Sequence, residues 1–263
     1  MTLALSWVRS VGKSRELVCV TDSRLRFGGH WDCGPKVFQN QRGDSAILFA
    51  GDTLYAYPII HHVNTCIAQH QKLRSRALDL PALNGHLIRV LNATVSQVAD
   101  LPKGVDTTPS VEFIFTGYDW RRRDFRAWLI HYDRRIQAFT SRPARRWTGG
   151  NSAKMLTLVG DYQTEFKTRL CALLKQRTKL SSGGFDMEPF EVLRDMLREG
   201  TFERIGGPPQ ILKIYQHLNT RPIAVLWPNA ESKKVSLGGR ALLDYETHDF
   251  LTLDPDTLQS EKD

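Results

Sequence analysis

The chain has 263 residues, of which 41% are hydrophobic and 24% are charged, and its formal net charge is +8. These proportions are ordinary for a globular protein. A transmembrane helix is not expected, because the sequence contains no run of about 18 apolar residues. The N-terminal stretch has no basic lead and no small-residue cleavage site, so no signal peptide is expected. The four cysteines form no CxxC pair, which argues against a disulfide framework or a metal site and favours the cytoplasm.

Much of the positive charge lies between Arg121 and Arg146, in the runs RRRDFR, DRR and RPARR. A basic patch can indicate nucleic-acid binding. No nucleic-acid-binding motif accompanies this one, and few aromatic residues are interleaved with the arginines. We therefore interpret these residues as solvated turns and outward strand faces, and we expect no nucleic-acid partner.

The first half of the chain predicts short strands followed by two helices. Strands are expected at 3–9, 17–22, 36–39 and 45–51, with a glycine-rich loop at 26–35. A helix is expected over 52–75, because its apolar residues recur at helical spacing. Asp52 is a suitable N-cap for this helix. A second helix fits residues 80–100.

The second half repeats this alternation. Strands are expected at 110–119, 125–133 and 135–141, then helices at 151–176 and 187–200, and a closing hairpin over 208–228. Asn151 or Ser152 is expected to cap the first of these helices. Antiparallel hairpins alternating with helix pairs predict an α+β protein, a four-layer αββα sandwich of two stacked antiparallel sheets. Residues 1–228 would form this domain, and residues 229–263 a partly ordered C-terminal extension.

Two charged residues stand at the ends of neighbouring predicted strands. Asp22 ends the apolar run LVCVTD, and Lys36 opens the run KVFQ after the glycine-rich loop. Such a pair is either a structural salt bridge or a device that tunes a nucleophile. Both interpretations stay open on these residues alone.

Four motifs in order resemble the proteasome β-subunit class of N-terminal-nucleophile hydrolases. Thr2 stands directly behind Met1, TDSR (21–24) ends the second strand, KVF (36–38) opens the next, and FAGDTLYA (49–56) leads into the first helix. TGGNSA (148–153) matches more weakly. The compact, propeptide-free bacterial proteasome-like peptidases are the most similar type. The likeness covers roughly residues 2–228.

The resemblance implies a catalytic set made of Thr2, Asp22, Lys36 and Gly51. Thr2 would be the nucleophile after Met1 is removed, with its own α-amine as the base. Lys36 would favour the ionised hydroxyl, and Asp22 would hold Lys36 in position. Gly51 would donate its N–H to the oxyanion. Phe49 would shape the specificity pocket.

Other features of the family are only partly matched. Thr148 and Asn151 are candidates for supporting the site. The family's later Asp and Ser have no match, since Glu203 near Gly206 is out of register. The resemblance implies no metal and no organic cofactor. It implies a homo-oligomer, a ring or a spiral, with a separate unfoldase as a further partner.

The function expected from these residues is hydrolysis of amide bonds in peptides through an acyl-enzyme on Thr2. Two alternatives stay open. One is an amidase acting on a small N-acyl substrate. The other is a catalytically silent αββα scaffold or interaction subunit, in which Thr2 is an ordinary strand residue and Asp22 and Lys36 only brace the sheet.

Overall fold

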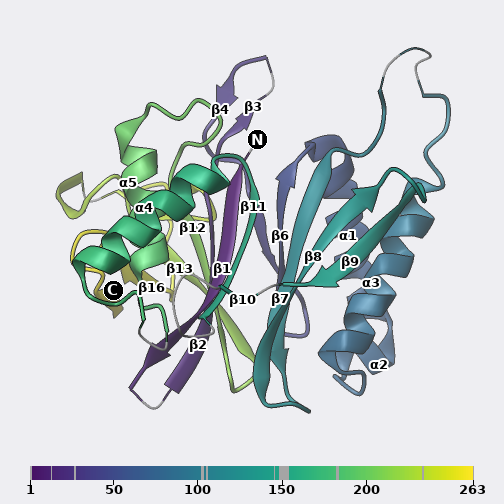
Figure 1. The fold of residues 1–263 in the computed structure, drawn as a ribbon, viewed down its shortest axis with the longest axis horizontal. Coiled ribbons are helices and arrows are strands. Elements are labelled where there is room, and N and C mark those ends of the chain that lie inside the picture. The colour runs from purple at the N-terminus through teal and green to yellow at the C-terminus, as the bar shows by residue number, and fades with distance from the viewer. Residues whose placement is uncertain are drawn as a thin grey trace.

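The computed structural model describes residues 2–12, 14–26, 28–101, 104, 106–144, 146–147, 154–181, 184–232 and 234–262. Within these residues the chain forms two large β-sheets, a small hairpin and five α-helices. Helices flank the outer side of each large sheet, and the two sheets face each other (Figure 1). The expected mixture of helices and antiparallel sheets is therefore confirmed.

The larger sheet contains both ends of the chain. Its main path runs in the order β10 (Arg146–Trp147), β11 (Lys154–Gly160), β1 (Leu3–Val11), β2 (Ser14–Thr21), β12 (Gln210–Tyr215), β13 (Asn219–Leu226), β14 (Val235–Leu237) and β15 (Arg240–Ala241). Two further strands, β16 (Leu251–Leu253) and β17 (Ser260–Lys262), join it through β13. The β13–β16 pair is parallel. The expectation of a wholly antiparallel sheet is therefore wrong at this pair.

The second sheet comes from the middle of the chain and is antiparallel throughout. It follows the order β5 (Val37–Gln39), β6 (Ser45–Gly51), β7 (Val111–Asp119), β8 (Asp124–Asp133) and β9 (Ala138–Pro143). The glycine-rich loop between the sheets contains the short hairpin of β3 (Leu25–Arg26) and β4 (His30–Trp31).

The helices pack in two groups. α1 (Thr53–Gln69), α2 (Gln71–Arg74) and α3 (Leu80–Val95) share a buried apolar cluster with β6 and β7. α4 (Gln163–Gln176) and α5 (Glu188–Glu199) share another with β1, β2 and β11. The predicted cap of the first helix is confirmed, because the Asp52 carboxylate accepts a hydrogen bond from the Leu54 N–H at 2.8 Å.

A third apolar cluster fills the space between the sheets. Strand β1 shows how one segment serves two clusters, because successive side chains of a strand point to opposite faces. Leu3, Leu5 and Trp7 face α4 and α5, whereas Ala4 and Val8 face the second sheet. Both faces of this strand are buried, so the position of Thr2 at its start is fixed by packing on two sides.

Two predicted elements differ from the structure. The helix expected over residues 151–176 is wrong in its first part, because Lys154–Gly160 forms strand β11 and helix α4 begins only at Gln163. A buried apolar run of this kind has no alternating pattern, so its sequence does not distinguish a strand from a helix. The C-terminal segment also holds more regular structure than expected, since β14 to β17 and the 3₁₀ helix Ala230–Ser232 lie within it.

Candidate active site

Thr2 directly precedes β1 and is bound by Asp161, in the turn that follows β11. Its N–H donates to the Asp161 carboxylate at 3.0 Å, and its carbonyl accepts from the Asp161 N–H at 2.6 Å. Gly160 permits this approach: its φ is +95°, and a Cβ atom there would lie 2.0 Å from the Thr2 carbonyl oxygen. Thr2 has no exposed surface.

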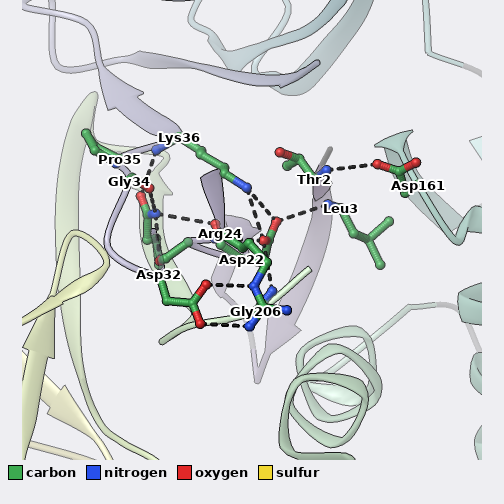
Figure 2. Close-up of polar contacts among 12 residues, drawn as sticks. Thr2, Leu3, Asp22, Arg24, Asp32, Gly34, Pro35, Lys36, Asp161 and Gly206 are labelled. Atoms are coloured by element: carbon green, nitrogen blue, oxygen red, sulfur yellow. Dashed lines mark hydrogen bonds and ion pairs between the residues drawn. The ribbon is translucent and has the colours of Figure 1, made fainter. Parts of the chain in front are cut away.

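Asp22 and Lys36 form a fully buried ion pair beside Thr2 (Figure 2). The Lys36 ammonium donates to both Asp22 carboxylate oxygens, at 3.0 and 3.1 Å. Asp22 is the first residue after β2, and Lys36 directly precedes β5. The sequence prediction that the fold brings these two side chains together is confirmed by this contact.

The Asp22 carboxylate is further fixed by backbone donors. It accepts from the N–H groups of Leu3, Arg24 and Gly206 at 3.0–3.1 Å. Donors of this kind stabilise the charged form of a buried carboxylate. The bond from Leu3 ties the pair directly to the residue that follows Thr2.

Burial lowers the pKa of Lys36 below its ordinary value. The charges of Asp22 and Asp161 act in the opposite direction, and the Asp22 hydrogen bond adds to them. The ammonium is therefore close to two carboxylates but shielded from water, an arrangement in which its charge acts strongly on neighbouring groups.

Two ion pairs surround this centre. Arg24 binds Asp32 through two hydrogen bonds of 2.7 and 2.8 Å. Arg204 donates to the second oxygen of Asp161 at 2.9 Å, and 59% of its side chain is exposed. Arg204 thus orients the same carboxylate that binds the Thr2 N–H.

Gly51 ends β6 at the same end of the molecule. A Cβ atom on Gly160 would lie 2.9 Å from Ala50, so the end of β6 borders the turn that holds Thr2. Gly51 has a φ of +115°, and a side chain there would meet the Ser110 carbonyl oxygen at 2.1 Å. An open hollow of about 260 Å³ lies beside it; the hollow is lined by Leu25, Arg26, Gly51, Asp52, Thr53 and Ser110.

The remaining predicted site residues do not join this group. Phe49 is fully buried and its ring packs against Phe38 and Tyr57 in the core under α1, so it does not face the hollow. Thr148 and Asn151 lie outside the described residues. Asp161 was not predicted, although the sequence LVGD ends an apolar run with an aspartate just as CVTD does at Asp22.

Among the residues that the structure describes, no group of three or more His, Cys, Asp and Glu residues is arranged to hold a metal ion. No helix in the same part of the chain is both long and apolar enough to cross a membrane.

No protein-family model and no curated protein matches this sequence. Among solved structures, the chain is similar to the Gly-1 mutant of Anbu from Hyphomicrobium sp. strain MC1. The two share 13% sequence identity with a TM-score of 0.55, and the match covers 84% of each chain. At this identity the likeness concerns the fold.

Proposed function

We propose that this chain is a proteasome-like N-terminal-threonine hydrolase that cleaves amide bonds in peptides through an acyl-enzyme on Thr2. The observation that carries the proposal is the position of Thr2 between two charged groups: Asp161 binds its N–H, and the buried Asp22–Lys36 pair is anchored to the adjacent Leu3 N–H. This arrangement supports assigning Thr2 as the nucleophile, its α-amine as the base and Lys36 as the activating cation.

The fold likeness to Anbu supports this class, because Anbu is a bacterial proteasome-like protein. The same likeness supports assigning the packed sheets and their flanking helices to the four-layer αββα fold. The choice of Thr2 as nucleophile and of peptides as substrate rests on the residues themselves.

The mechanism begins when Met1 is removed, so that the Thr2 nitrogen becomes an α-amine. This amine takes the proton of the Thr2 hydroxyl as its oxygen attacks the substrate carbonyl carbon. Lys36 stabilises the developing negative charge on the hydroxyl oxygen, and Asp22 holds Lys36 in place. Asp161 and Arg204 keep the amine oriented.

The tetrahedral intermediate carries an oxyanion, and we assign its stabilisation to the Gly51 N–H. One such donor can contribute about 3 kcal/mol to transition-state binding. The protonated amine then gives its proton to the leaving amine, the C–N bond breaks, and an ester on Thr2 remains. Water, deprotonated by the same amine, hydrolyses the ester and restores the Thr2 hydroxyl.

Intact-mass measurement tests the proposal in two steps. Protein from its native host is expected to lack Met1, because the mechanism requires a free α-amine. That protein is then treated with a peptide epoxyketone, which reacts with an adjacent amine and hydroxyl together. The parent protein and Thr2→Ser should gain the mass of the reagent, whereas Thr2→Ala should not.

Two results would contradict the proposal. Retention of Met1 in all of the native protein would favour the silent scaffold. An adduct on Thr2→Ala would place the nucleophile elsewhere in the chain.

By the same resemblance we propose that the protein forms a homo-oligomer, a ring or a spiral, that receives its substrates from a separate unfoldase. Sedimentation velocity of the full chain tests the first part, and a monomer at all concentrations would contradict it.

A further inference from the structure

One buried glutamine joins three segments of the candidate active site. Gln210, at the start of β12, is 1% exposed. Its side-chain oxygen accepts from the Lys36 N–H at 2.9 Å. Its nitrogen donates to the Gly34 carbonyl at 2.7 Å and to the Ser23 hydroxyl at 2.9 Å. The residue after Asp22 and the backbone of Lys36 are therefore bound to the same amide group.

The C-terminal segment lies directly against this amide. The turn between β14 and β15 consists of Gly238 and Gly239. A Cβ atom on Gly239 would lie 2.5 Å from the Ser23 hydroxyl oxygen and 2.8 Å from the Gln210 nitrogen, and its φ is +94°. Real Cβ atoms do not approach other atoms so closely, so only glycine fits here without moving Ser23 or Gln210.

The segment that carries this turn is itself held by the main sheet. β14 pairs with β13 through Val225 and Ser236, and Ser236 is 3% exposed. The Gly238–Gly239 turn is therefore anchored to the main sheet through β14.

We propose that Gln210 is a positioning residue for the Asp22–Lys36 pair and that the Gly238–Gly239 turn holds it in place, so that the C-terminal segment is required for a competent active site. This inference rests on the proposed function. The physical reason is that the Lys36 ammonium keeps its bonds to Asp22, beside Thr2, only while the Lys36 backbone keeps its position. An error of about 1 Å in such a site can cost about a hundredfold in rate.

The two glycines of the turn provide a matched pair of variants. Both have positive φ, +60° at Gly238 and +94° at Gly239, but a Cβ atom on Gly238 meets nothing within 4 Å. Gly238→Ala therefore places a methyl group in the same turn without touching the network. Gln210→Met is a third variant, which keeps the side-chain length and removes the hydrogen bonds.

The first measurement is independent of catalysis. Hydrogen exchange of the Lys36 amide reports its bond to Gln210, because a released N–H exchanges faster. We expect Gly239→Ala and Gln210→Met to speed this exchange by about tenfold or more relative to Gly238→Ala, since each disturbs the same acceptor. Equal exchange in all three variants would overturn the supporting role of the turn.

The second measurement is the rate of epoxyketone adduct formation as a function of pH, in the full chain. Gly239→Ala and Gln210→Met should react about tenfold or more slowly than Gly238→Ala, with a shifted alkaline limb, because the surroundings of Lys36 have changed. Equal rates after correction for the folded fraction would overturn the inference while leaving the proposed function standing. If the parent itself forms no adduct, the proposed function fails and this inference fails with it.

Discussion

At the scale of single residues, the central feature is the buried ammonium of Lys36, which is bound to Asp22 and lies beside Thr2. A buried ion pair is weak support for stability, because desolvation offsets the attraction between the two charges. The Asp22 carboxylate already has three backbone donors, on Leu3, Arg24 and Gly206. Lys36 is therefore not needed to satisfy it, which favours a catalytic over a bracing role.

Replacing Lys36 by Met separates these two roles. Met preserves most of the volume and removes the charge. Because the backbone donors of Asp22 remain, we expect the free energy of unfolding to fall by only about 1–3 kcal/mol. Adduct formation with the epoxyketone should be lost in the protein that remains folded. Full reactivity of folded Lys36→Met would instead make the pair a structural brace.

The pH dependence of the reaction should be bell-shaped. The rate should rise as the Thr2 amine loses its proton, near its ordinary pKa of about 7.7–8.0. As the pH rises further, the rate should fall when Lys36 loses its proton, because a neutral Lys36 no longer stabilises the hydroxyl oxygen. Burial lowers the pKa of Lys36, so this fall should occur at a pH below 10.5, the ordinary lysine pKa.

Asp22→Asn provides the check on this assignment. The Asp22 charge raises the pKa of Lys36, so its removal should move the descending limb to lower pH. Adduct rates measured across the range, with folding followed at each pH, would show this. A descending limb that stays in place would assign it to another group.

At the scale of elements, most strands and helices are predicted, including β1, whose two faces are both buried, but β11 is not. The sequence predicts a helix over the residues that form strand β11, and for this reason it does not single out Asp161. Inside a helix, Asp161 would have been one polar residue among several. At the end of a strand paired with β1, it lies opposite Thr2. The Asp22–Lys36 pair was predictable because each residue stands at the end of a recognisable strand.

The role of Gln210 could not be read from the sequence for a different reason. Its partners are Ser23, Gly34 and Lys36, more than 170 positions away in the chain. No local pattern encodes such contacts. Likewise, the close approach of Gly239 becomes visible only once β14 is paired with β13.

The C-terminal segment also contains an ion pair that makes its stability depend on pH. Arg240 of β15 donates to the carboxylate of Glu246, which follows this strand in the chain, at 2.7 Å. The Leu243 N–H donates to the same carboxylate at 2.7 Å. These bonds lower the pKa of Glu246 from its ordinary 4.5 to about 2. In the unfolded chain the Glu246 carboxylate binds a proton more readily than in the folded chain. The ion pair therefore contributes fully to the free energy of unfolding above pH 4.5, and this contribution disappears as the pH falls toward 2.

We therefore expect Glu246→Gln to destabilise the protein above pH 4.5 and to have progressively less effect as the pH approaches 2. Denaturant unfolding of the parent and the variant at several pH values measures the difference. Glu261→Gln, at an exposed position on β17, is the control and should not reproduce this trend. A difference between the parent and Glu246→Gln that is constant with pH would show that the ion pair does not stabilise the segment.

At the scale of the whole molecule, Gly51 of the candidate active site and the turn of Arg121, Arg122 and Arg123 lie at opposite ends of the second sheet. Gly51 pairs with Val111 at the start of β7, whereas Arg121, Arg122 and Arg123 form the turn after its end at Asp119. Val111 and Asp119 are the first and last residues of this nine-residue strand, and the eight steps between them span about 26 Å at the usual rise per residue. These three arginines are therefore remote from Gly51 and from the neighbouring Thr2.

Replacing Arg121, Arg122 and Arg123 by Ser should leave the rate of adduct formation within about twofold of the parent, because the Coulomb interaction over this distance is screened by salt. The cost in stability should also be small: Arg121 and Arg122 have side chains 56% and 65% exposed, and their nearest carboxylates are 3.6 and 4.0 Å away.

Arg204→Ser is the matched control, because the same change of side chain removes the partner of Asp161. It should slow adduct formation, since the Thr2 amine then loses its orientation. If the triple variant stayed folded but lost reactivity while Arg204→Ser kept it, the arginine cluster would belong to the active site and the placement argued from β6 and β7 would be wrong.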